Sequence, residues 1–160
     1  MNGEQKQGFW NESRSIRLTR VCTLALIAVC VCMVAAGVPI SRFFIDRGFI
    51  AVRGRWALPL CLLAGYLCAA AALAMLVVMY RFLGRLEKGE VFSRANVRSL
   101  RRIGFCCAAG GLFSLLAGIA LLHEFLYVAL AAGFMTLIVR IVKNAFEQAV
   151  RMKEELDYTV

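Results

Sequence analysis

The stretch WALPLCLLAGYLCAAAALAMLVVMY, residues 56–80, runs for 25 residues without one charged side chain. An α-helix rises about 1.5 Å per residue, so about 20 apolar residues cross the roughly 30 Å of hydrocarbon in a bilayer. This stretch is long enough to cross a membrane as one helix. The composition agrees, because 61% of the 160 residues are hydrophobic and only 18% are charged, whereas soluble domains are about a quarter charged.

Three further uncharged runs flank residues 56–80. Residues 21–41 and 103–122 contain 21 and 20 residues, whereas 125–139 contains only 15. We expect the last helix to continue to about residue 143, because Arg140 and Lys143 can extend their charged groups towards lipid head groups. The sequence therefore predicts an all-α integral membrane protein, a bundle of four transmembrane helices at about 21–41, 56–80, 103–122 and 125–143.

These spans divide the chain into three parts. Residues 1–20 form an N-terminal segment, residues 21–147 the four-helix domain, and residues 148–160 an acidic C-terminal tail. A secretory signal peptide is the alternative interpretation of the first run, since three arginines precede it, but its apolar core is longer than signal peptides usually have.

Lys and Arg are distributed unevenly among the segments that connect the spans. The segment before the first span, the second loop and the tail hold 4, 7 and 4 of them, and the first and third loops hold 4 and 0. Short segments rich in Lys and Arg stay in the cytoplasm. We therefore expect both termini to face the cytoplasm. This asymmetry explains the net charge of +9, and the basic clusters lack the interleaved aromatic residues that direct nucleic-acid binding uses.

The second loop contains GEVFSRANVRSLRRIG, residues 89–104, where a new helix is predicted to begin. Ser93 is a suitable N-cap, and Phe92 and Val97 have the spacing of a hydrophobic staple. We expect one helix from about residue 94 to 122. Four of its arginines recur at helical spacing and share one stripe: Arg94, Arg98, Arg101 and Arg102.

Two interpretations of this arginine stripe stay open. It is either an anchor of the kind that the positive-inside rule describes or a docking surface. The acidic end of the chain, with Glu154, Glu155 and Asp157, is a candidate partner on the same side of the membrane. We hypothesise that the tail folds back on the arginines or competes there with another protein.

The same loop carries a resemblance to a known family. Its residues are similar to the central signature of the bacterial family catalogued as domain of unknown function 2975: Gly89, Phe92, Ser93, Asn96, Leu100, Arg101, Ile103 and Gly104. The chain also ends as that family does, with Glu155, Asp157, Thr159 and Val160. The resemblance implies four helices in a bacterial cytoplasmic membrane, and a gene often adjacent to that of a small helix-turn-helix regulator. It implies no catalytic residue.

The seven cysteines all lie inside the predicted spans and contain no CxxC pair. Thiols suit helix packing in such places, so we expect no metal and no other cofactor. His123 and Glu124 interrupt the apolar pattern between the last two spans. A water-exposed turn explains them most simply, and a role in sensing pH or a ligand is the alternative.

Small residues recur every four positions on the third span, at Gly110, Ser114 and Gly118. This spacing favours a compact bundle or a homodimer over a wide pore. The first three spans carry no Asp, Glu, Lys or Arg at depth, which argues against ion-coupled transport. We also find no nucleophile and base that would form an active site. The loop RFFIDRGFIAVRGRW, residues 42–56, is expected at the head groups, with recognition of an external peptide or lipid as the alternative.

Together these patterns predict a non-enzymatic bacterial membrane protein. It would contact membrane lipids and bind or sequester a cytosolic regulator, or another partner, through its basic helix and acidic tail. A small transporter, or an immunity-type protein against a membrane-active peptide, is the alternative.

Overall fold

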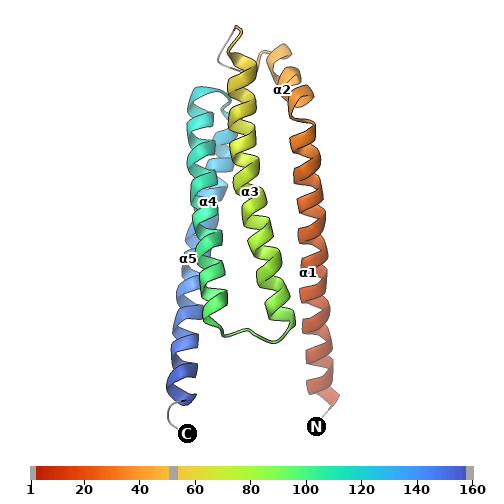
Figure 1. Cartoon of the computed structure of the whole chain (residues 1–160), viewed down its shortest axis with the longest axis vertical. Helices are drawn as coiled ribbons and strands as arrows, with labels where there is room; N and C mark the ends of the chain where they lie inside the picture. The colour runs from red at the N-terminus through yellow and green to blue at the C-terminus, as the bar shows by residue number, and fades with distance from the viewer. Residues whose placement is uncertain (1–2, 51–53, 158–160) are drawn as a thin grey trace.

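The computed structural model describes residues 3–50 and 54–157, with side chains for residues 15–50 and 54–156. These residues form helices and no strands, which confirms the predicted all-α class (Figure 1). The helices are α1 (Gly3–Ala35), α2 (Gly37–Asp46), α3 (Ala57–Glu87), α4 (Arg94–Ala120) and α5 (Glu124–Asp157). Four segments are long and apolar enough to cross a membrane: Ser15–Ala35, Ala57–Glu87, Arg94–Ala120 and Glu124–Leu156.

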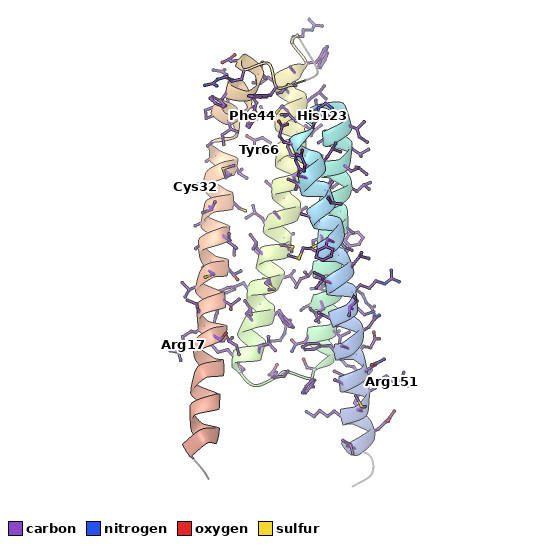
Figure 2. The ribbon with its side chains drawn as sticks, turned by 180° about the vertical axis from the view of Figure 1, so that it is seen from behind. Arg17, Cys32, Phe44, Tyr66, His123 and Arg151 are labelled. Carbon is purple, nitrogen blue, oxygen red and sulfur yellow. The ribbon has the colours of Figure 1, made fainter. Side chains whose placement is uncertain are left out.

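The four long helices run side by side and give the molecule two distinct ends (Figure 1). One end carries the loop between α3 and α4 together with both ends of the chain, and we call it the linker end. The other end carries α2 and the short turn between α4 and α5, and we call it the α2 end. Figure 2 places Arg17 and Arg151 towards the linker end, and Phe44, Tyr66 and His123 at the α2 end.

The first predicted span, residues 21–41, is not one helix, because α1 ends at Ala35 and α2 begins at Gly37. Pro39 explains the break, since proline has no amide hydrogen to donate to the carbonyl four residues earlier and its ring crowds that carbonyl. Regular hydrogen bonding resumes at Ile40, whose amide nitrogen lies 3.1 Å from the carbonyl oxygen of Ala36. The chain therefore changes direction near the α2 end.

The long helices follow the spatial order α1, α3, α4, α5. α4 packs against both α3 and α5, and α3 also packs against α1 and α2. Among the described residues, the backbone of α1 does not closely approach α4 or α5. The helices thus form an open row rather than a closed ring. Large apolar side chains point away from it, such as Ile119 and Leu130, which are 71% and 75% exposed, as expected for surfaces that face hydrocarbon.

Small residues on α4 allow its two neighbours to come close. A Cβ atom at Gly110 would lie 3.4 Å from Ala71 of α3, and one at Gly118 would lie 2.7 Å from Leu126 of α5. Ser114 is buried, with its hydroxyl 3.5 Å from the sulfur of Cys68. The small-residue pattern is therefore used for packing within one chain.

A hydrophobic core cluster closes the α2 end. It consists of Ile50, Cys61, Ala117, Leu121 and Leu122, and the partly buried Phe44, Ile45, Ala64 and Phe125 pack against it. The loop of residues 42–56 therefore does not lie wholly at the surface: part of it belongs to α2 and to this cluster, whereas Phe43, Phe49 and Trp56 are exposed.

Candidate docking surface at the linker end

The loop between α3 and α4 turns sharply before α4 begins. Gly89 has a φ of +80°, a left-handed conformation that glycine adopts without steric cost. Ser93 then caps α4, and its side chain accepts a hydrogen bond from the backbone nitrogen of Asn96 at 3.3 Å. The predicted start of the helix at Arg94 is confirmed.

Asn96 fastens this loop to the preceding helix. Its side chain is completely buried and donates hydrogen bonds to the carbonyl oxygens of Glu90 and Val91, at 2.5 and 2.9 Å. Its side-chain oxygen accepts a hydrogen bond of 2.8 Å from Nε of Arg85, and Arg85 also donates to the hydroxyl of Ser99. The first turn of α4 is therefore held in one position relative to α3.

α5 continues as a helix through the acidic end of the chain, so its last turns lie beside the first turn of α4. A helix of 34 residues is longer than the roughly 20 residues that a bilayer requires, and these last turns extend beyond the apolar stretch. Arg94 donates two hydrogen bonds to Glu154, from Nε at 2.7 Å and from a terminal nitrogen at 2.8 Å. This contact lowers the pKa of the Glu154 carboxyl. The acidic segment thus reaches the arginine stripe without folding back.

A groove of about 580 Å³ lies between these two helix ends. Buried Val97 and Val150 contribute apolar surface, and charged side chains surround them: Arg94, Arg98, Glu147, Arg151 and Glu154. On α5 the charged members recur at helical spacing and share one face. We call this surface the arginine groove. Arg98 and Arg151 are exposed, and no ion pair joins either to another described side chain.

The other predicted site residues lie outside the arginine groove. Arg101 and Arg102 are exposed on α4, and Glu155 is exposed on α5. Asp157 ends α5, and its side chain, together with Thr159 and Val160, falls outside the described residues. The predicted stripe is thus divided, because of its four arginines only Arg94 and Arg98 line the arginine groove.

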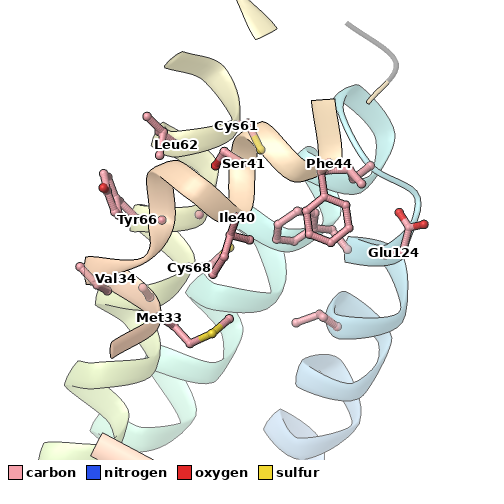
Figure 3. A pocket seen from close by; sticks show the side chains of 16 residues that line it. Met33, Val34, Ile40, Ser41, Phe44, Cys61, Leu62, Tyr66, Cys68 and Glu124 are labelled. Atoms are coloured by element: carbon pink, nitrogen blue, oxygen red, sulfur yellow. The ribbon is translucent and has the colours of Figure 1, made fainter. Parts of the chain in front are cut away.

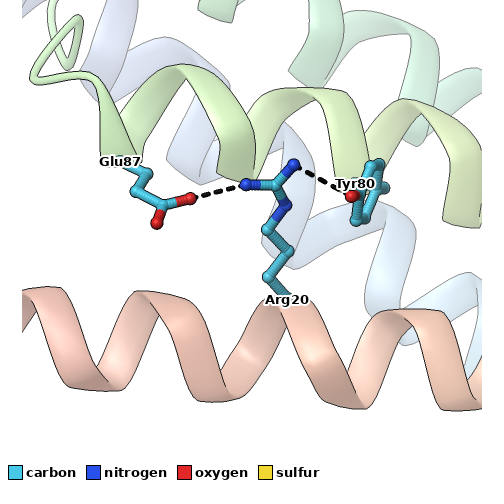
Figure 4. Close-up of polar contacts among 3 residues, drawn as sticks. All are labelled: Arg20, Tyr80 and Glu87. Carbon is cyan, nitrogen blue, oxygen red and sulfur yellow. Dashed lines mark hydrogen bonds and ion pairs between the residues drawn. The ribbon is translucent and has the colours of Figure 1, made fainter.

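A second polar contact at the linker end joins α1 to α3 (Figure 4). The guanidinium of Arg20 donates to the carboxylate of Glu87 at 2.6 Å and to the hydroxyl of Tyr80 at 2.9 Å. It also lies 4.6 Å from the centre of the Tyr80 ring. From the sequence, Arg20 contributed only to the charge count and to the arginines that precede the first span, since nothing there indicated which helix it would meet.

The residues considered for metal or redox chemistry do not come together. The seven cysteines are free thiols on several helices. Within the described part of the chain, no three His, Cys, Asp or Glu residues form a group that could hold a metal ion. His123 is exposed in the turn between α4 and α5.

Residues 21–160 match the family model described as a protein of unknown function, DUF2975. The chain belongs to this family. No match was found among curated proteins or among solved structures.

In this DUF2975 chain, several residues that carried the resemblance have clear structural roles. Gly89 forms the turn, Ser93 caps α4 and Asn96 fastens the loop. Gly104 faces Val139 of α5, and a Cβ at Gly104 would lie 3.4 Å from its methyl carbon, an ordinary contact distance. The signature therefore describes how the linker end is built.

Proposed function

We propose that this chain is a non-enzymatic protein of the bacterial cytoplasmic membrane, with its linker end in the cytoplasm, and that it binds a cytosolic protein there. The distribution of charge supports the orientation. Of the 19 Lys and Arg residues, 15 belong to the N-terminal segment, the second loop and the tail, the parts that lead to the linker end. Such residues in short segments resist transfer across the membrane.

The arginine groove is the observation that carries the proposal. The Asn96 hydrogen bonds hold the start of α4 against the preceding loop and α3, and the Arg94–Glu154 pair joins α4 to α5 at this end. Beside that pair, Arg98 and Arg151 are exposed. A rigid surface that presents two such guanidinium groups favours an acidic partner surface, because complementary charges guide association and fix its register.

The partner that we propose is the small helix-turn-helix regulator whose gene is often adjacent in this family. An acidic patch on that regulator would bind the arginine groove, and the regulator would then be held at the membrane. Lipid anchoring alone would require positive charge but no particular arrangement of it. The two explanations therefore differ in whether the position of each arginine matters.

A capture experiment with the full chain in nanodiscs of zwitterionic lipid tests this proposal. We expect the regulator to be retained by the natural chain and by the control variant Arg101→Glu/Arg102→Glu. Retention should fall by about tenfold or more for Arg98→Glu/Arg151→Glu, because juxtaposed like charges disfavour binding. Both variants change the net charge equally, so they separate a specific surface from general attraction.

Two results would contradict the proposal. Equal retention by the natural chain and the Arg98→Glu/Arg151→Glu variant would remove the arginine groove from binding. An equal loss in both variants would show that only overall charge matters. The alternative, a small transporter or an immunity-type protein, would depend instead on residues that line the helix bundle.

A further inference from the structure

An apolar cavity lies at the α2 end, opposite the arginine groove (Figure 3). Its volume is about 360 Å³, within the range of about 300 to 1,000 Å³ that small-molecule pockets occupy. α1 contributes Val34 to one side, and Ile40 and Phe44 of α2 cover it. α3 forms its floor and the first turns of α5 form the opposite side.

The open order of the helices explains why this space exists. α1 and α5 do not approach each other, so among the described residues no helix fills the gap between them above α3. The break at Ala36 redirects α2, and Phe44 packs against the same core cluster as Phe125 of α5. On the floor, a Cβ atom at Gly65 would meet no other atom within 4 Å. The cavity is thus open between α1 and α5. The outer faces of both helices are apolar, so a molecule dissolved in the bilayer can reach the cavity.

Glu124 is the charged residue of the cavity lining, which is otherwise almost wholly apolar. It is the first residue of α5, is exposed, and lies at the rim (Figure 3). No ion pair links it to another described side chain. An apolar space of this kind does not hold water well, whereas a carboxylate at its edge attracts a cation and disfavours an anion.

We propose that this cavity binds a cationic amphiphile, a molecule with one apolar chain or ring system and an ammonium head. The apolar part occupies the space between α1, α3 and α5, and the head donates a charge-assisted hydrogen bond to the Glu124 carboxylate. An acyl chain with a neutral or anionic head would fill the same space without using Glu124. This site is separate from the arginine groove and does not depend on the proposed function.

Photolabelling of the full chain in phosphatidylcholine nanodiscs tests the proposal. The probe is dodecylamine with a diazirine on its chain, and dodecanol with the same diazirine is the neutral comparison. We expect the amine to label peptides that line the cavity, such as those with Met33, Cys68 and Val128. Unlabelled dodecylamine should compete with this labelling, and this arm needs no altered protein.

Two pairs of measurements on variants complete the test. Gly65→Leu should abolish labelling by the amine, because the larger side chain fills the cavity. Gly133→Leu is the control and should leave this labelling unchanged. Gly133 is a helical glycine that also has open space around it, but it lies outside the cavity. Glu124→Gln should weaken labelling by the amine by about tenfold, which is the loss expected for a hydrogen bond to a charged group. The same variant should leave labelling by dodecanol unchanged. Unaltered labelling in Gly65→Leu would overturn the site. Equal labelling by amine and alcohol, insensitive to Glu124→Gln, would show that only lipid chains enter.

Discussion

Asn96 joins the start of α4 to the preceding loop and to α3 at the linker end. It is completely buried, and its side chain bonds two loop carbonyls and Arg85 of α3. A buried polar group of this kind is stabilising only while all of its partners are present. Its environment explains why an asparagine, with donors and an acceptor in one short side chain, suits this position.

The Asn96→Ala variant should therefore lose stability. It removes the donors to Glu90 and Val91 and leaves Nε of Arg85 without its acceptor, for an expected cost of about 1–3 kcal/mol in the free energy of unfolding. The matched control is Asn144→Ala, because Asn144 is exposed on α5. Thermal unfolding in detergent measures both, and equal stability of the two variants would contradict the role assigned to Asn96.

The sequence could predict part of this local structure. The Ser93 cap and the start of α4 follow from local residue types, and both are confirmed. The hydrophobic staple between Phe92 and Val97 stays a prediction. From the sequence, Asn96 was identified only as one residue of the family resemblance, because its partner Arg85 lies on the preceding helix and their approach depends on how the two helices pack.

Among the helices, α4 is one of the two inner members of the row, and it packs along both α3 and α5. Its small residues decide how near these neighbours come. The closest approach is at Gly118, where an added Cβ atom would lie 2.7 Å from the Leu126 side chain and 2.9 Å from its backbone nitrogen. Backbone cannot move aside as a flexible side chain can, so this contact limits what position 118 accepts.

Gly118→Ala is expected to destabilise the protein by about 1–3 kcal/mol, the range for overpacking a close contact. Gly133→Ala is the control, because a Cβ at Gly133 meets nothing within 4 Å. That change should be neutral or stabilise the helix by up to about 1 kcal/mol. Unfolding measured on both variants separates the two effects, and a stabilising Gly118→Ala would show that α4 and α5 are not in this close contact.

The ends of the helices depend on more than the distribution of charge along the sequence. Uncharged runs located the four long helices, since membrane thickness sets their length. They did not locate the break at Ala36, although Pro39 was visible in the sequence, because counting charges takes no account of backbone donors. The length of α5 was also underestimated, since its last turns are polar and are supported by contacts with α4.

The whole molecule presents two different surfaces at its two ends. The linker end is charged and held together by Asn96, by the Arg94–Glu154 pair and by the contact of Arg20 with Glu87. The α2 end contains the apolar cavity with Glu124 at its rim. Helical spacing in the sequence indicated Arg94 and Arg98, with Glu154 as a candidate partner, but it could not predict the groove itself, which requires the pairing of α4 with α5. It could not predict the cavity either, because the cavity requires the open helix order.

The orientation of the chain in the membrane is the central claim, and labelling of intact cells measures it directly. In a chain whose own cysteines are replaced, the Arg98→Cys variant reports on the linker end and Arg47→Cys on the α2 end, since both positions are exposed. A membrane-impermeant maleimide should label the Arg47→Cys variant in intact cells and the Arg98→Cys variant only after the membrane is opened. Labelling of the Arg98→Cys variant in intact cells would contradict the account.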